Sequence, residues 1–210
     1  SFYGTSIVGT VSGTSISFGT AVVFRSVFLT GTTPECSAFD SNSNKVVIAY
    51  RYVGNSGEAV VGTVSGTSIS FGSALHEYIP IDDDTATVFD STNNKIVVFF
   101  RNTSTSTGGC QVGTVSGTSI SLGAQQTFVA ATAYPQYMSA VFDSDSGKTV
   151  TVYRAVSSNN NYGTAFVGTV SGTSISFGTS VVYESSDSTY NTLAYDSTTG
   201  KVVIGFRANT

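Results

Sequence analysis

Ten consecutive residues, VGTVSGTSIS, occur four times without a single change, beginning at Val8, Val61, Val112 and Val167. The successive starts lie 53, 51 and 55 residues apart, and the rest of the 210-residue chain is long enough for a fourth period of 51 residues. A fixed internal period is typical of repeat architectures, in which each repeat is one supersecondary unit. The chain is therefore predicted to hold four whole repeats, with its two ends cut inside one of them.

Each period is predicted to contain four short strands, which we name A to D from the axis outward. In the first complete period, strand A is Ser37–Asp40. Strand B, Lys45–Arg51, is β-branched and almost continuously apolar, as expected of a strand buried on both faces. Strand C is Ala59–Val64, and strand D, Ser68–Gly72, alternates polar and apolar residues. Four antiparallel strands in about 50 residues are the pattern of a β-propeller blade.

The position of the chain ends predicts how such a propeller closes. The arginine that ends strand B precedes the next VGTV segment by 10, 11 and 13 residues inside the chain, and by 11 residues when Arg207 is joined across the termini to Val8. The sequence thus predicts an all-β fold, a single four-bladed propeller over residues 1–210. Strands C and D at the N-terminus would complete strands A and B at the C-terminus, leaving no sheet edge unpaired. The expected blades are residues 35–75, 85–128, 138–183, and 191–210 together with 1–24.

Aromatic residues recur at three positions of the repeat. They are Phe39, Phe89, Phe142 and Tyr195 in strand A; Tyr50, Phe100, Tyr153 and Phe206 in strand B; and Phe18, Phe71, Leu122 and Phe177 in strand D, where one leucine takes the place of an aromatic. Sugar stacking is one interpretation. Core packing between the blades is favoured because the residues recur in every blade and interiors must be filled densely.

The composition excludes several classes of function. Charged residues make up 10% of the chain, against about 25% in an average domain, and the net charge of −4 provides no basic surface for nucleic acid. No apolar run approaches the roughly 18 residues of a membrane span. We expect no cofactor. Cys36 and Cys110 are expected to be isolated thiols, with a disulfide between them as the less favoured alternative, and neither arrangement resembles a metal site. A surface rich in Ser, Thr, Gly and Asn suits an extracellular location, on a cell or virion surface, and contact with sugars.

The turn between strands A and B begins with Asp and ends with Lys in every repeat: Asp40–Lys45, Asp90–Lys95, Asp143–Lys148 and Asp196–Lys201. Spaced oxygen atoms in these turns invite a calcium interpretation. However, each turn has few carboxylates and lacks the terminal acidic ligand of a calcium loop. An Asx turn, in which the Asp side chain accepts hydrogen bonds from the turn backbone, is favoured instead.

The segment between strands C and D, Ser65–Phe71, resembles the Asp-box, or BNR repeat, of sialidase-like propellers. That motif has Ser, a Gly-containing turn, then Thr and an aromatic residue at the same place in the blade. The motif's Asp is missing from all four copies, so the chain resembles a degenerate form of it. The tandem block also resembles surface proteins of marine microbes and phages. In the Asp-box family the motif is structural, so the resemblance implies an architecture and no catalytic residue.

The B–C and D–A loops are predicted to share one face of the propeller, and they vary between repeats while the A–B and C–D turns barely change. Ser, Thr, Asn, Gly and an occasional Tyr fill these loops, a mixture that binds sugar hydroxyls but is also ordinary for exposed loops. The candidate ligand-binding residues in this region are Asn55, Asn102, Asn160 and Tyr162.

An arginine ends strand B in all four blades: Arg51, Arg101, Arg154 and Arg207. Arranged around an axis, these side chains would bind carboxylate or sulfate bidentately, as in a sialic acid, a uronic acid or a sulfated glycan. The alternative, which the regular recurrence favours, is that each arginine pairs locally with backbone carbonyls or with acids such as Glu35, Glu58, Glu77, Glu184 or the Asp82–Asp84 run.

Catalysis has little support in the sequence. The single histidine, His76, is expected in a loop, and the acidic residues form no recognisable pair of the kind that glycoside hydrolysis needs. The favoured hypothesis is a non-catalytic, glycan-binding module whose partners are glycans or cell-surface polysaccharide. The alternative is a structural building block that self-associates into filaments by strand complementation between chains. A glycosidase-like enzyme is the remote alternative.

Overall fold

The computed structural model describes residues 3–26, 36–52, 56–79, 84–102, 104–131, 133–157 and 160–209. The regular elements within these ranges are strands that form antiparallel sheets. The first four strands make up the N-terminal half-blade: β1 (Gly4–Ser6), β2 (Gly9–Ser12), β3 (Ser15–Phe18) and β4 (Val22–Arg25). β1 pairs with β4 and β2 with β3, so this half-blade consists of a strand C and a strand D, each interrupted once.

Three blades with all four strands follow along the chain. The first blade comprises β5 (Cys36–Asp40), β6 (Lys45–Arg51), β7 (Gly57–Ser65), β8 (Ser68–Phe71) and β9 (Leu75–Ile79). The second comprises β10 (Thr85–Asp90), β11 (Lys95–Asn102), β12 (Thr107–Ser116), β13 (Ser119–Leu122) and β14 (Gln126–Val129). The third comprises β15 (Tyr134–Asp143), β16 (Lys148–Val156), β17 (Asn161–Ser171), β18 (Ser174–Phe177) and the first part of β19 (Val181–Asp196). The predicted strands A to D are therefore present, and strand D is longer than expected because a second segment continues it.

The C-terminal half-blade consists of the second part of β19 and of β20 (Lys201–Asn209). β19 leaves the outer edge of the third blade, where it pairs with β17, and continues as the strand A that pairs with β20. The third blade and the C-terminal half-blade thus belong to one continuous sheet, in the order β15-β16-β17-β19-β20.

Both turn types of the repeat follow from local chemistry. The hairpin of each VGTVSGTSIS copy has a two-residue turn, as in the pair Ser12–Ser15, and its glycine has a positive φ of 58–61° in all four copies, as a type II′ turn requires. In the A–B turns, Asp40 Oδ1 accepts hydrogen bonds from the backbone N–H groups of Asn42 and Ser43, both at 3.0 Å. Equivalent bonds form at the other three Asp residues, so the Asx-turn prediction is confirmed.

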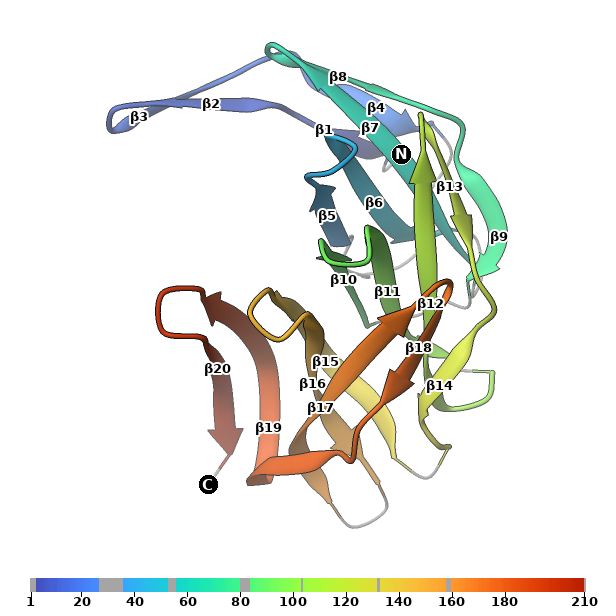
Figure 1. Cartoon of the computed structure of the whole chain (residues 1–210), viewed down its shortest axis with the longest axis vertical. Coiled ribbons are helices and arrows are strands. Elements are labelled where there is room, and N and C mark those ends of the chain that lie inside the picture. Colours follow the sequence, from blue (N-terminus) through green and yellow to red (C-terminus); the bar gives the residue numbers. More distant parts are fainter. Residues whose placement is uncertain are drawn as a thin grey trace.

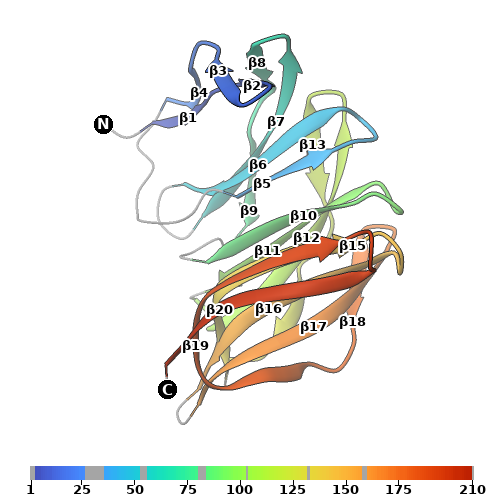
Figure 2. The same cartoon turned by 90° about the vertical axis from the view of Figure 1, so that its left-hand side faces the viewer.

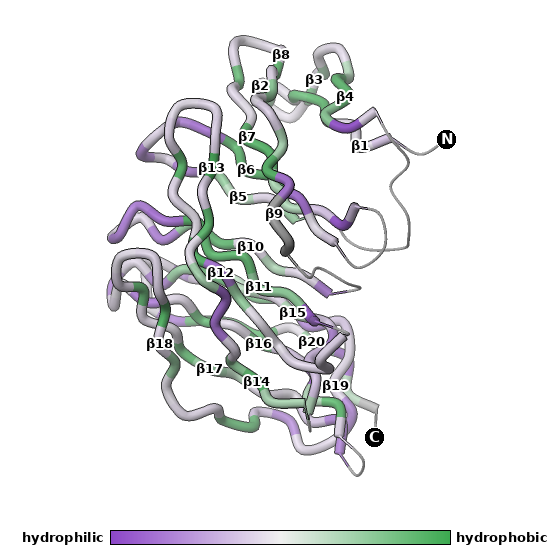
Figure 3. Tube along the Cα trace, turned by 90° about the vertical axis from the view of Figure 1, so that its right-hand side faces the viewer, coloured by the Kyte–Doolittle hydropathy of each residue, from purple (hydrophilic) through white to green (hydrophobic). Residues whose placement is uncertain are grey.

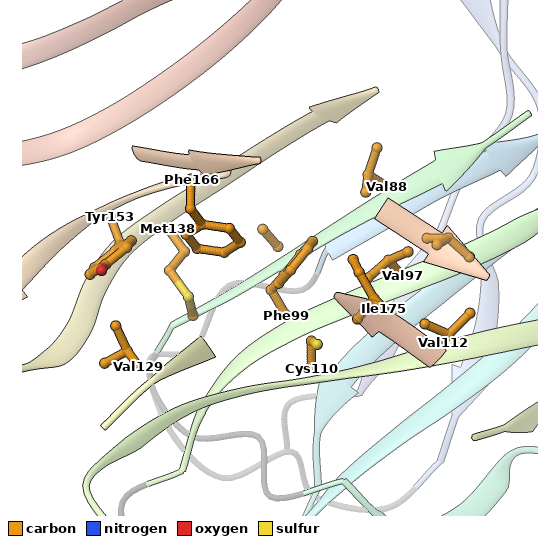
Figure 4. Packing of buried hydrophobic residues seen from close by; sticks show 12 residues of the cluster. Val88, Val97, Phe99, Cys110, Val112, Val129, Met138, Tyr153, Phe166 and Ile175 are labelled. Carbon is orange, nitrogen blue, oxygen red and sulfur yellow. The ribbon is translucent and has the colours of Figure 1, made fainter. Parts of the chain in front are cut away.

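The core lies between the faces of successive blades. Between the first and second blades, Val47, Val61 and Ala49 pack with Ile96, Val98 and Phe100. A second cluster joins the second and third blades, in which the rings of Phe99 and Phe166 lie 5.9 Å apart (Figure 4). Figure 3 shows the same division along the trace: hydrophobic segments in the middle strands and hydrophilic turns at one rim.

The predicted closure of the ring is wrong. Among the described residues, β20 pairs with β19 alone, and β2 pairs with β3 alone. The blades follow one another along an open arc, with the two half-blades at opposite ends of it (Figures 1 and 2). The physical reason is that the bulk of the side chains between two sheets sets the angle between them, and the spacing of the strands in the sequence contains no information about that angle.

The open arc also changes the predicted aromatic layers. Tyr50, Phe100 and Tyr153 of strand B are buried, as expected of core residues. Their equivalent in the C-terminal half-blade, Phe206, is 40% exposed, and Phe18 in the N-terminal half-blade is 60% exposed. Core packing therefore holds for the aromatic residues that have a blade on each side. It fails at the two ends of the arc, and also at Phe39, which is exposed on the first blade.

Two smaller expectations concern the cysteines and the membrane. Neither Cys36 nor Cys110 forms a disulfide. Burial raises the pKa of Cys110 to about 12, so its sulfur is protonated at neutral pH and a poor nucleophile. In the part of the chain that the structure describes, no helix is long and apolar enough to cross a bilayer.

Candidate functional site

Two tyrosines at equivalent positions of the last two repeats have an unusual backbone conformation. The pairing of β15 with β16 and that of β19 with β20 each contain a register shift, and Tyr137 and Tyr190 lie at these bulges. Their φ angles are 52° and 56°, a region that bulky residues rarely adopt. β-Bulges of this kind redirect a side chain, and strain of this kind gathers at binding sites. The two residues are therefore candidates for a ligand contact.

Hydrogen bonds with two other segments hold the strained backbone of Tyr137. The Tyr137 N–H donates to Asp84 Oδ1 at 2.7 Å, and Asn191 Nδ2 donates to the Tyr137 carbonyl at 3.2 Å. Asn191 is buried in turn, and its Oδ1 accepts a hydrogen bond from the Tyr183 hydroxyl at 2.9 Å. Burial is also the main cause that raises the pKa of Tyr183. The rings of Tyr137 and Tyr190 lie 5.0 Å apart, so neighbouring blades present them as one aromatic pair.

The aromatic pair lines a pocket of about 200 Å³ at the junction of the third blade and the C-terminal half-blade. β15 contributes Tyr137, β19 contributes Asp187, Thr189 and Tyr190, and β20 contributes Arg207. The pocket thus combines two aromatic faces, a hydroxyl, a carboxylate and a guanidinium. This is the type of lining that holds a small polar ligand with an apolar face.

The arginines that end strand B have different partners in different blades. Arg154 has two close partners: its Nε lies 2.7 Å from Asp187 Oδ1, a charge contact without hydrogen-bond geometry, and its Nη1 donates to Gln136 Oε1 at 3.0 Å. When the Asn161 side-chain amide is turned so that its oxygen faces Arg154, that oxygen accepts a hydrogen bond from Arg154 Nη2 at 2.9 Å. Arg101 is buried and lies 3.7 Å from Asp84. For these two arginines the structure shows the local pairing that the alternative interpretation described.

Arg207 differs from the other strand B arginines. Its side chain is exposed, and no acidic group of the described residues lies within ion-pair distance of it. Asp187, which lines the same pocket, is engaged by Arg154. The pocket therefore holds one guanidinium whose charge is not compensated by a neighbouring carboxylate, and such a group binds carboxylate or sulfate oxygens bidentately.

The remaining predicted site residues are dispersed. Arg51 is half-buried at the end of β6, and because the arc is open the four arginines do not surround a closed axis. Asn102 is buried, and its Oδ1 accepts a hydrogen bond from the Thr105 N–H at 3.3 Å. Asn160 is exposed in the loop before β17, where it bonds to Ser157.

Tyr162 lies nearest to the pocket, because it pairs with Asp187 across β17 and β19. Asn55 lies outside the described residues, as do Glu35 and Asp82–Asp83. His76 was expected in a loop but lies on β9.

A second polar cluster connects the N-terminal half-blade to the first blade. Glu58 is 1% exposed and accepts hydrogen bonds from Arg25 Nη2 and the Tyr50 hydroxyl, both at 2.8 Å, and His76 Nδ1 lies 2.6 Å from it. The Arg25 guanidinium also stacks on the Tyr52 ring at 4.4 Å. Because the carboxylate is buried and both its oxygens have partners, this cluster stabilises the junction, and its exposed member is His76, whose side chain is 61% exposed.

Sequence reasoning missed Tyr137 and Tyr190. Each stands five residues before the strand A aromatic, Phe142 or Tyr195, whereas the second repeat has Asp84 at that distance before its aromatic. A comparison of the repeats position by position, instead of by loop content, would have found a tyrosine shared by two neighbouring repeats.

No model of a known protein family matches the chain, and neither does any curated protein sequence. Solved structures do match. A point mutant of the NanB sialidase from Streptococcus pneumoniae aligns with a TM-score of 0.65 and 19% identity over 90% of this chain. The same sialidase in complex with a substituted ethanesulfonate aligns with a TM-score of 0.61 and 20% identity, and a structure of NanB with Optactamide with a TM-score of 0.60 and 17% identity.

The likeness to NanB concerns the fold. Each alignment covers 90% of this chain but 30% of the NanB chain, so the repeats correspond to less than a third of that protein. At this level of identity the comparison shows a shared sialidase-like, propeller-like arrangement of all-β blades, and the Asp-box details of the predicted resemblance are not part of what it shows. The roles of the pocket residues are therefore inferred from the geometry of this chain and not from NanB.

Proposed function

We propose that this chain is a non-catalytic, glycan-binding module that holds an acidic sugar in the pocket between the third blade and the C-terminal half-blade. The observation that carries the proposal is the meeting of two tyrosines in strained backbone conformations with the uncompensated guanidinium of Arg207 around a volume of about 200 Å³. That volume lies below the roughly 300–1,000 Å³ of common small-molecule pockets, so it suits a single sugar unit rather than an extended polymer.

The lining accounts for each part of such a ligand. The paired rings of Tyr137 and Tyr190 offer an aromatic face to the C–H face of a pyranose, and Thr189 offers a hydroxyl to the ring substituents. Arg207 supplies the counter-charge for a carboxylate or sulfate. Sialic acids, uronic acids and sulfated sugars are the classes that combine these features, and the proposal is an anionic sugar of one of these three classes.

The sialidase-like fold supports a carbohydrate-related function, because the proteins that share it here are named as sialidases. The pocket has one carboxylate, Asp187, which Arg154 engages, whereas glycoside hydrolysis commonly uses two carboxylates in different environments. Binding without hydrolysis is therefore the function that we propose. An extracellular location, at a cell or virion surface, follows as part of the same proposal.

The test is a glycan array with sialylated, uronic and sulfated sugars, followed by titration calorimetry with the strongest acidic hit. We expect Arg207→Gln to weaken binding at least tenfold, since a charge-assisted bidentate contact contributes about 1.5–3 kcal/mol. The matched control is Lys201→Gln, which removes one exposed positive charge at the other end of β20 and leaves binding unchanged.

The proposal would be overturned by an array without reproducible acidic hits, by an equal effect of the two substitutions, or by release of free sugar from a bound glycan. The first two remove the site, and the third replaces a binding module with an enzyme. Retained binding to neutral glycans alone would also remove the role of Arg207.

A further inference from the structure

The two ends of the arc are complementary halves of one blade. The N-terminal half-blade consists of strands C and D, and the C-terminal half-blade consists of strands A and B. We propose that the N-terminal half-blade of a second copy of this chain docks on the C-terminal half-blade, so that copies associate head to tail. The free strand edges carry this proposal and the pocket does not, although β20 also contains the pocket residue Arg207.

The three inner blades define the register that the docked strand pair would take. Strand B pairs with strand C through Val47 and Val61 in the first blade, Val97 and Val112 in the second, and Val150 and Val167 in the third. The same alignment places Val203 of β20 opposite Val8. At the end of the strands, Arg51, Arg101 and Arg154 each face a glycine: Gly57, Gly108 and Gly163. The equivalent of these glycines opposite Arg207 is Gly4.

In each inner junction, the glycine that follows strand D touches the hairpin turn of the next blade, and the last of these glycines, Gly178, has no such neighbour among the described residues. A Cβ atom on Gly19, Gly72 or Gly123 would overlap the carbonyl oxygen of Thr67, Thr118 or Thr173, because the turn of the next hairpin lies directly against each glycine. The fourth glycine of the series, Gly178, has open space: among the described residues only the Val167 carbonyl lies within 4 Å of such a Cβ, at 3.8 Å. The turn that fills this position in the series contains Thr14.

The apolar surfaces at the two ends match in the same way. In the second blade, Val112 is fully buried, in one cluster with Val170 and Ile175 of the next hairpin. Its equivalent in the third blade, Val167, is 44% exposed. The residues that would cover it are Val11 and Ile16 of an N-terminal half-blade, which are 71% and 55% exposed. Each end thus exposes the hydrophobic side chains that the other end would bury.

The occupant is a second copy because the chain's own N-terminal half-blade is held elsewhere. Phe24 packs against the rings of Tyr50 and Phe71, and Arg25 pairs with the buried Glu58. These contacts fix the half-blade to the first blade, at the end of the arc remote from Gly178 (Figure 1). Head-to-tail contacts of this kind either close into a ring of copies or continue as a filament.

The first experiment measures the mass of the chain by sedimentation velocity over a range of concentrations. We expect complexes of two or more copies, and a shift to monomer at every concentration for Gly178→Val, because the added side chain occupies the space needed by the turn of the second copy. The control is Ser176→Val, which adds the same side chain at a position that is exposed in all four repeats. A circular dichroism spectrum and melting temperature like those of the unchanged chain show that Gly178→Val still folds.

The second experiment identifies the occupant. In a Cys36→Ser background, a chain with Val203→Cys is mixed with a chain carrying Val8→Cys and treated with a short bis-maleimide cross-linker. A cross-linked product of one copy of each supports the proposal. A chain with both substitutions that cross-links only within itself would overturn it, as would the absence of any cross-link or a monomeric mass for the unchanged chain at all concentrations.

Discussion

The third and the first copies of VGTVSGTSIS fold into the same hairpin but differ in what covers them. In both, valine pairs with isoleucine across the hairpin, Val115 with Ile120 and Val11 with Ile16. Ile120 is 6% exposed because the first blade packs against it, whereas Ile16 is 55% exposed at the end of the arc. Ten residues therefore determine a local fold, and the neighbouring sheet determines how much those residues contribute to stability.

The largest difference in stability between the two copies is expected when their isoleucines are truncated. We expect Ile120→Ala to lower the free energy of unfolding by about 2–5 kcal/mol, as truncation of a buried side chain does. Ile16→Ala, the same change in the same ten residues, should cost no more than about 0.5 kcal/mol in the monomer. Urea unfolding at low protein concentration measures both, and equal losses would show that the first copy is as well covered as the third.

A smaller effect is expected from the glycines that follow strand D. Gly123→Ala introduces a methyl group where the Thr173 carbonyl lies, and we expect overpacking to cost about 1–3 kcal/mol. Gly178→Ala has open space and a φ outside the left-handed region, so the monomer should be unchanged or slightly more stable. The melting temperatures of the two variants test this expectation. A large drop in melting temperature for Gly178→Ala would mean that another group already fills the space beside Gly178.

The smallest effect concerns the A–B turns, which should respond alike in an inner and a terminal blade. Hydrogen bonds from Ser146 and Thr199 lower the pKa values of Asp143 and Asp196. The stabilisation that these hydrogen bonds give the folded state is therefore present above the unfolded pKa of about 3.9. It is lost as the pH falls through the lower pKa values of the folded state. Asp143→Asn and Asp196→Asn should each make stability slightly less dependent on pH between about 5 and 2. Urea unfolding midpoints measured across that pH range should shift by the same amount in the two variants. A shift in only one of them would show that the turn does not depend on its own hydrogen bonds alone.

The sequence predicted the parts of the fold that depend on short-range chemistry. Strand B of the first blade has the predicted bounds, Lys45–Arg51, and the Asp40 turn has the expected hydrogen bonds. The closed ring could not be predicted from the length of the repeats, because closure depends on the angles between sheets and hence on how residues such as Phe99 and Phe166 fill the space between them.

The candidate site was predicted in part. Arg207 was among the sequence candidates, and its difference from Arg154 depends on Asp187, which is distant in sequence from Arg154 and adjacent to it in space. The strained conformations of Tyr137 and Tyr190 are a property of the bulges in β15 and β19. No residue type in these strands signals a bulge by itself, so this part of the site required the structure.

The equivalent bulges of β15 and β19 have a consequence for valency. The pocket lies at the junction between two consecutive repeats, and each of the two repeats contributes a tyrosine to it. The number of such pockets in a related array would therefore scale with the number of junctions whose two repeats both carry the tyrosine, rather than with the number of repeats. Duplicating a single tyrosine-bearing repeat beside itself would therefore add one more aromatic pair of this kind without any new side chain.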